Sequence, residues 1–437
     1  MDLEIGPVFD FHHLSIIFGH KNVCNNTNNT QSPDDILRFQ TIIIGYQREI
    51  QKLINTSKIE QLHIVVSKLY SYLSSLESIP FSNKIIELNF ANTLIALFDQ
   101  YKALRSLVSC IFTSLASNKD YIDRFIESFD PLNYIYYENG PEIITINALV
   151  YATKMIQFNL IYMIEKSDFF QLLLGYCMNI TNLQNVNIVY LFIYNCCIKI
   201  SSIKFLDEYV NIFINIITYI FNTFENYNDL CICSLIFLVL NQKCKFDDFS
   251  THLVQHIKAM EIKSPYYGLW LISFLIQSDE KFLQIFAEDN FVIDQIFNAH
   301  IDEPLVTKDC RCSIIFYFGT ILSQNHQIQD INMYAQFIIT QYGNMNIQFK
   351  IVSIYFVTTI LSMCQFSQLQ DLDFDQLFEI LSDILILQNY LKFKYSDFQV
   401  IIERIKANTA GWTVNINDLL ERNDIISQLE IISDDDQ

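Results

Sequence analysis

The sequence predicts an all-α protein, built as a right-handed α-solenoid superhelix of about eight or nine stacked helical units. Three observations lead to this fold class. The 437 residues include only 9 Gly and 7 Pro, well below the average usage of about 7% Gly and about 5% Pro. Hydrophobic residues make up 51% of the chain. Strongly apolar segments recur about every 40 to 44 residues, which is the spacing of stacked helical repeats.

Each of these apolar segments is long enough for two or three helical turns and is apolar on all sides. Such a helix must be buried, and one repeat cannot bury it alone, so neighbouring repeats must stack. More amphipathic helices are expected between them, for example at 205–221, 291–301 and 374–387. The apolar segments are 64–73, 104–115, 146–156, 188–198, 232–240, 269–276, 313–322, 351–361 and 398–405.

The first helix is expected to begin after the loop that ends at residue 31. Ser32 can cap it, Pro33 suits its first turn, and Asp34 and Asp35 complement its positive end. We therefore predict a partly disordered lead-in over residues 1–31, an armadillo-like repeat domain over 32–432 and an acidic tail over 433–437.

Prolines mark several later unit boundaries. Pro141, Pro265 and Pro304 each come shortly before an apolar segment, a position that suits helix N-termini. Runs of alternating β-branched residues are scarce, so almost no β-structure is expected.

The charge balance favours some partners and disfavours others. There are 48 acidic and 28 basic residues, a net charge of -20. Such a chain repels nucleic-acid phosphates and anionic membrane surfaces, whereas Lys/Arg-rich protein segments are attracted. The alternative interpretation is that the negative net charge only keeps a strongly hydrophobic protein in solution.

The cysteines indicate a reducing compartment. Their number, 11, is odd, and no disulfide framework is visible. Several lie inside apolar helical patterns, where a free thiol behaves as a small hydrophobe. The N-terminus lacks the basic region of a secretory signal. We therefore expect a cytoplasmic protein, with a nuclear location as the alternative.

Three apolar stretches are candidates for membrane-spanning helices. They are 205–224, 230–240 and 351–364. The first is interrupted by polar residues, and the other two fall short of the about 20 apolar residues that a span needs. We expect buried helices, with a membrane protein as the alternative.

Catalysis is not expected. The chain has no nucleophile-elbow motif, no phosphate-cradling glycine loop and no dinucleotide fingerprint. We predict no enzyme activity, no cofactor and no metal. Asp371, Asp373, Asp375 and Glu379 surround a helix start near Phe374, where carboxylates stabilise a helix N-terminus.

Three groups of residues could be read as metal ligands. His252 and His256 share one helical face, but no Glu follows the first histidine as in metalloproteases. Cysteines with C-x-C spacing lie in or beside apolar helices, which favours core packing. The N-terminal group matches no common site. The second and third groups are Cys231, Cys233, Cys244, Cys310 and Cys312, and Asp10, His12, His13, His20 and Cys24.

The segment from Tyr266 to Leu322 resembles an armadillo repeat followed by the start of the next. It has an apolar helix, a short polar turn, a second helix and an acidic break before a third. The run Leu269–Ser273 is most similar to importin-α adaptors, and the resemblance extends weakly over residues 60–410. It implies a concave groove that binds an extended peptide.

In importin-α adaptors, a Trp on the inner helix stacks on a cargo Lys or Arg, and an Asn one turn later holds the peptide backbone. Trp270 matches this Trp, with Phe274 in the Asn position. Asn195 matches the Asn, with Leu191 in the Trp position. The basic autoinhibitory arm has no counterpart, since residues 1–35 hold only Lys21.

We therefore predict a non-catalytic adaptor or scaffold that binds an extended peptide or helix, basic in character, in the groove. A nuclear-import adaptor for basic localisation signals is the alternative. Aromatic rings bury large areas at low entropy cost, so some should reach the groove, although most should be core. The groove candidates are Tyr190, Tyr194, Asn195, Tyr267, Trp270, Tyr317 and Tyr355.

Overall fold

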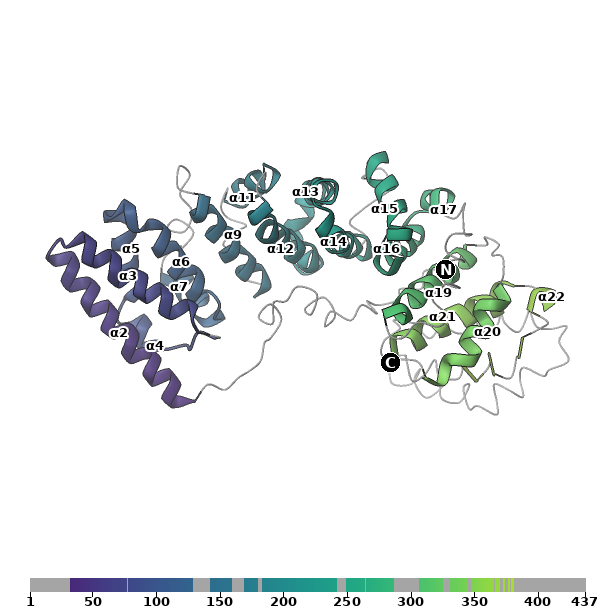
Figure 1. Ribbon diagram of the computed structural model, residues 1–437, viewed down its shortest axis with the longest axis horizontal. Helices are drawn as coiled ribbons and strands as arrows, with labels where there is room; N and C mark the ends of the chain where they lie inside the picture. Colours follow the sequence, from purple (N-terminus) through teal and green to yellow (C-terminus); the bar gives the residue numbers. More distant parts are fainter. Residues whose placement is uncertain are drawn as a thin grey trace. The chain divides into compact units, whose positions relative to one another are not determined.

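The computed structural model is helical throughout the part of the chain that it describes (Figure 1). This confirms the all-α prediction, and no strand occurs among the described residues. The lead-in, the acidic tail and the segments 291–301 and 398–405 lie outside them. The described residues are 32–76, 78–128, 142–158, 169–179, 183–241, 249–263, 265–286, 306–324, 331–344, 347–364, 366–369, 372, 373, 376, 377, 379 and 380.

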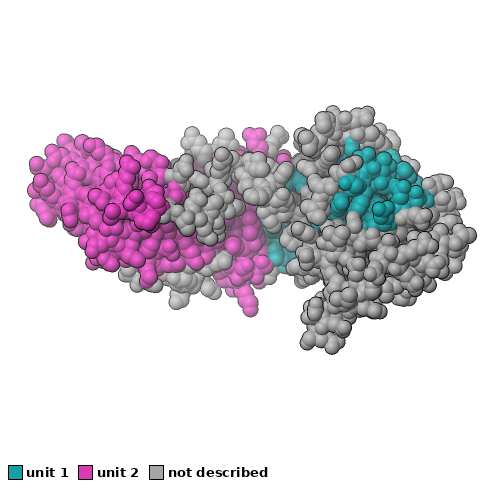
Figure 2. Space-filling view, turned by 90° about the horizontal axis from the view of Figure 1, so that it is seen from below, with its two compact units in different colours: residues 1–24, 235–437 teal, residues 25–234 magenta. Residues whose placement is uncertain are grey.

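The chain divides into two compact units (Figure 2). Unit 2 is residues 25–234, and unit 1 is residues 1–24 with 235–437. The boundary falls inside helix α14 (Asn228–Leu240). The single repeat domain over 32–432 stays a prediction.

Unit 2 contains a succession of α-helices joined by short 3-10 turns. They are α2 (Pro33–Asn55), α3 (Ile59–Ser74), α4 (Asn83–Glu87), α5 (Phe90–Gln100), η1 (Lys102–Leu104), α6 (Arg105–Leu115), α7 (Lys119–Ser128), α9 (Glu142–Gln157), α11 (Phe169–Met178), α12 (Leu183–Lys199), η2 (Lys204–Tyr209), α13 (Val210–Thr223), η3 (Glu225–Tyr227) and the first half of α14.

The predicted start of the first helix is confirmed. Ser32 is the N-cap of α2 and Pro33 is its first residue. The backbone N–H of Asp35 donates to Ser32 Oγ at 3.2 Å. One of the unpaired N–H groups that every helix start leaves open is thereby satisfied.

The helices formed by the apolar segments of unit 2 pack on one another in sequence order. Helix α3 packs on α6, α6 on α9, and α9 on α12. The helices that lie between them in the sequence pack against this stack: α5 contacts α6, and α13 contacts α12. Residues such as Val66, Phe112 and Phe192 are fully buried in these contacts. The apolar helices thus bury one another, as the sequence predicts.

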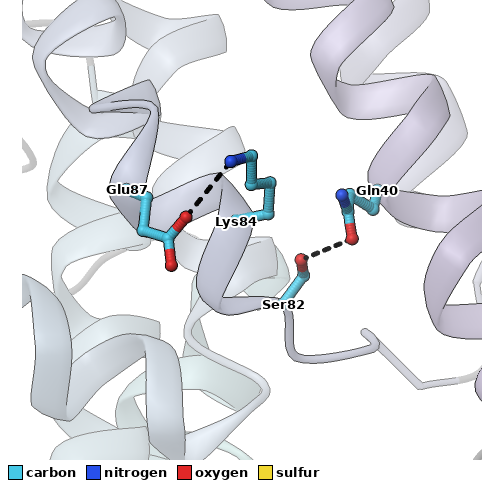
Figure 3. A network of polar contacts seen from close by, with 4 residues as sticks. All are labelled: Gln40, Ser82, Lys84 and Glu87. Carbon is cyan, nitrogen blue, oxygen red and sulfur yellow. Dashed lines mark hydrogen bonds and ion pairs between the residues drawn. The ribbon is translucent and has the colours of Figure 1, made fainter.

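Hydrogen bonds between side chains and more distant parts of unit 2 span a narrow range of sequence separation. Figure 3 shows one of them, Ser82 Oγ donating to Gln40 Oε1 at 3.4 Å, next to the surface ion pair of Lys84 and Glu87. Four examples, with their separations, are Gln40–Ser82 (42), Pro80–Tyr121 (41), Ser109–Asn147 (38) and Tyr190–Ser234 (44). These separations match the spacing of the apolar segments.

One predicted helix is interrupted. The segment 205–221 forms the 3-10 turn η2 and then the α-helix α13. Phe205 and Tyr209, both in η2, pack edge-on against Phe170 with ring centroids 5.1 and 4.9 Å away. The residues of this 3-10 turn therefore pack in the core of unit 2.

Unit 1 continues the same pattern of successive helices. Helix α16 packs on α19, and α19 on α21; all three arise from predicted apolar segments, and Pro265 opens α16 as expected. The bounds are α15 (Thr251–Lys263), α16 (Pro265–Ser278), α17 (Glu280–Phe286), α19 (Val306–Ser323), α20 (Ile331–Gln341), η5 (Tyr342–Asn344), α21 (Ile347–Met363) and α22 (Phe366–Leu369).

None of the helices in the described ranges combines the length and the apolar character that crossing a bilayer requires.

Helices α19 and α21 approach closely at Gly319, which gives a stability prediction. A Cβ there would lie 2.9 Å from Tyr355 Cε1, and the Tyr355 ring is 1% exposed and cannot swing away. We expect Gly319→Ala to lower the free energy of unfolding by about 1–2 kcal/mol, because overpacking outweighs the better helix propensity.

Gly45 in α2 is the matched control. A Cβ there would meet nothing within 4 Å. Gly45→Ala should therefore raise the free energy of unfolding by about 0.5–1 kcal/mol. Urea unfolding followed by circular dichroism measures both. Equal shifts for the two variants would contradict the close approach of α19 and α21.

Candidate partner-binding face

The predicted groove residues of unit 2 are packed inside the helix stack. Tyr190 is 1% exposed; its hydroxyl lies 3.2 Å from Ser234 Oγ, and its ring stacks on Tyr194 with centroids 5.8 Å apart. Burial raises the pKa of the Tyr190 hydroxyl well above its usual value. Asn195 uses its Nδ2 to donate to the carbonyl of Leu191 at 2.7 Å.

The predicted groove residues of unit 1 are also packed inside. Trp270 is fully buried and stacks on Phe316, with ring centroids 4.3 Å apart. The Tyr317 hydroxyl donates to the carbonyl of Phe286 at 2.8 Å. Tyr355 donates to Ser323 Oγ at 3.5 Å, and Tyr267 packs edge-on against Tyr266.

None of the seven predicted residues is more than 7% exposed. The physical reason is that the helices carrying them are apolar all round, so their large rings fill the space between neighbouring helices. A bound peptide would find almost none of their surface. Their burial assigns these side chains to packing, so any partner would have to contact other residues.

An exposed side of the stacked helices is visible in unit 2. On α9, Ile143 is 45% exposed, and Ile146, Val150 and Lys154 are half-buried. Their spacing of three and four residues places them on one side of the helix. The intervening residues Asn147 and Tyr151 are buried toward the neighbouring helices.

The neighbouring helices carry matching rows. We call the combined surface the front face: Leu107, Cys110 and Ser114 on α6; Ile143, Ile146, Val150 and Lys154 on α9; Ile188, Leu191, Asn195 and Ile198 on α12. Each row has helical spacing, and within it the side chains of Cys110 and Asn195 are buried while the others are half-buried or exposed.

Hydrogen bonds join the α6 row to α9. Asn147 Nδ2 donates to Ser109 Oγ at 2.8 Å and to Cys110 Sγ at 3.1 Å. Burial raises the pKa of the Cys110 thiol, although its hydrogen bonds with Asn147 and Tyr70 act in the opposite direction. The thiol is therefore protonated at neutral pH and acts as a packing group.

The rows of the front face contain no carboxylate, and their one charged side chain is Lys154. Helices α6 and α12 contain no carboxylate, and α9 contains only Glu142 at its first position. Lys154 and Lys199 lie in the last turns of α9 and α12. Exposed carboxylates of unit 2 lie on other elements: Asp34, Asp35 and Glu49 on α2, Glu60 on α3, Glu87 on α4, Asp99 on α5, Asp120 on α7, and Asp207 and Glu208 on η2.

The corresponding helices of unit 1 offer no such row. On α16 every residue from 267 to 276 is buried, and on α19 every residue from 311 to 322. On α21 the same holds from 349 to 362, except for the half-buried Lys350. Among the described residues, the candidate binding surface therefore lies on unit 2.

The sequence contains the spacing of Ile143, Ile146 and Val150, yet the front face could not be predicted from it. Helix α9 is apolar on nearly every side, so its pattern does not distinguish the side that neighbours cover from the side that they leave open. Only the packing order of α6, α9 and α12 makes that distinction.

The candidate metal ligands do not form a site in the described part of the chain. His252 and His256 have ring centroids 4.4 Å apart, but no group of three or more His, Cys, Asp or Glu among the described residues could hold a metal ion. Cys231, Cys233 and Cys312 are buried and form no disulfide. Cys244 and the N-terminal group lie outside the described residues.

The acidic group near Phe374 is described only in part. Asp373 Oδ1 accepts a hydrogen bond from the backbone N–H of Gln376 at 3.2 Å. This is the stabilising contact with a helix start that the sequence predicts. Asp371 and Asp375 lie outside the described residues.

No protein-family model matches this chain, and no curated protein is significantly similar to it. The case for a function therefore comes from the front face and from the order in which the helices pack.

Proposed function

We propose that this protein is a non-catalytic interaction scaffold that holds an extended peptide or a helix of a partner protein. The observation that carries the proposal is the front face of unit 2, where α9 and α12 each leave a row of mainly apolar side chains exposed or half-buried, and the neighbouring α6 adds the half-buried Leu107. Adjacent helices with apolar rows form the type of surface that receives a partner helix through anchors spaced three and four residues apart.

The scaffold we propose is an armadillo/HEAT-like solenoid of about eight or nine repeats. Two observations support it. The apolar helices pack on one another in chain order within each unit. The long-range side-chain hydrogen bonds within unit 2 cluster near one repeat length, from 34 for Thr113–Asn147 to 44 for Tyr190–Ser234.

A basic partner stays a prediction from the net charge of -20. The exposed carboxylates among the described residues of unit 2 lie on α2, α3, α4, α5, α7 and η2, so a Lys/Arg-rich segment would be attracted to those elements. The import-adaptor alternative has less support, because Trp270, the one residue in the Trp position, is fully buried.

Site-specific photo-crosslinking tests the scaffold function. A photoreactive residue replaces Ile146 on the front face of the full-length protein, and Leu37 on α2, which is 59% exposed, serves as the control position. We expect a defined partner to crosslink at position 146 and not at 37. The same crosslinks at both positions, or none at 146, would refute the proposal.

A second variant checks that the crosslink reports binding. Ile146→Glu puts a charge into the apolar row without touching the buried side of α9, so folding should be retained. The binding of the crosslinked partner should fall at least about tenfold, which corresponds to about 1.4 kcal/mol. Leu37→Glu should leave that binding unchanged.

A further inference from the structure

The charge on the front face indicates the chemistry of its occupant, if the face binds a partner as proposed above. The one charged side chain in its rows is cationic, Lys154 on α9, and Lys199 follows directly after Ile198 in the last turn of α12, at the edge of the face. No carboxylate lies in the three rows. This holds in a chain with 48 acidic and only 28 basic residues.

We infer that the front face binds an amphipathic helix with an apolar stripe and acidic flanking residues. The apolar stripe would pack on Ile143, Ile146 and Val150 of α9 and on Ile188 and Leu191 of α12, which are the exposed or half-buried anchors. Glu or Asp beside the stripe would meet Lys199 at the edge of the face, and Lys154 adds to the positive potential there.

Net charge and local charge make opposite predictions here, which makes the inference testable. The whole chain, at -20, repels an acidic peptide and attracts a basic one. At physiological ionic strength, charges more than about 8 Å from the peptide are largely screened. Preference for an acidic peptide can therefore come only from the charges beside the site.

The experiment uses two synthetic helical peptides with the same apolar stripe, at positions i, i+3, i+4 and i+7. One has Glu and the other Lys at the flanking positions. Fluorescence anisotropy with the full-length protein at 0.15 M salt measures both affinities. We expect the Glu peptide to bind at least about threefold more tightly, consistent with one or two exposed ion pairs.

Three variants locate the effect. Lys199→Glu should reduce or reverse the preference for the Glu peptide, whereas Lys119→Glu, an exposed position on α7, should leave it unchanged. Ile146→Glu should weaken both peptides. Retention of the full preference by Lys199→Glu would overturn the inference.

The remaining outcomes separate this inference from the scaffold function. Tighter binding of the Lys peptide, lost in Ile146→Glu, would overturn the acidic occupant and leave the scaffold standing. Failure of both peptides to bind would also overturn the inference. The proposed scaffold function would still be tested separately, by the photo-crosslinking at position 146.

Discussion

Trp270→Ala should lower the free energy of unfolding of unit 1 by about 3–5 kcal/mol, the usual effect of removing a buried Trp. Trp270 is fully buried in α16. Its ring stacks on Phe316 of α19 at 4.3 Å and on Phe274 of its own helix at 5.7 Å. Its removal leaves a cavity at the contact between two apolar helices, which their rigid packing cannot fill.

Urea unfolding followed by circular dichroism measures this loss. Trp270→Phe is the matched variant, because it keeps an aromatic ring against Phe316 and should lose clearly less stability than Trp270→Ala. If Trp270 instead lined an open groove, both variants would cost less than about 1 kcal/mol. That result would contradict its packing role.

Alkaline pH should destabilise the folded chain strongly. Burial raises the pKa of the thiols of Cys177, Cys196, Cys231 and Cys233 well above the ordinary value. In the unfolded chain these thiols ionise near pH 8.5. Above that pH the unfolded state releases protons that the folded state retains, so stability falls as pH rises.

The size of the effect follows from the number of thiols. Each contributes a loss of about 1.4 kcal/mol per pH unit between its unfolded and folded pKa values. Below about pH 8 their contribution is fully present and constant. Thermal unfolding between pH 7 and pH 10.5 should therefore show a plateau and then a steep fall in Tm.

A cysteine variant isolates this contribution. Cys177→Ala removes one of the buried thiols, so the pH dependence of its unfolding free energy above pH 9 should be shallower by about 1.4 kcal/mol per pH unit. Its stability at pH 7 serves as its own reference. An unchanged slope would show that the thiol at position 177 ionises in the folded state.

Local features of the chain were predictable because they depend on neighbours in sequence. Ser32, Pro33 and Asp35 form the start of α2 as expected. The apolar segments at 146–156 and 313–322 form α9 and α19. Continuous apolar character without Gly or Pro leaves the α-helix as the favoured backbone conformation.

The candidate site was much less predictable. Because aromatic residues favour interfaces, the sequence predicts Tyr190, Trp270 and Tyr355 as groove residues, yet their rings occupy the contacts between helices of the same chain. The exposed positions on the front face are aliphatic, such as Ile146 and Leu191. In sequence they look the same as buried positions of the same helices.

The sequence by itself determined that this chain is helical, where its most apolar helices lie, and that these helices must cover one another. Only the tertiary structure decided which sides they cover. Burial depends on neighbours about 40 residues away, such as Asn147 against Ser109. The sequence of a helix that is apolar on all sides does not show which side its neighbours leave uncovered. The exposed side of α9 and α12 is therefore known only from the packing of the helices.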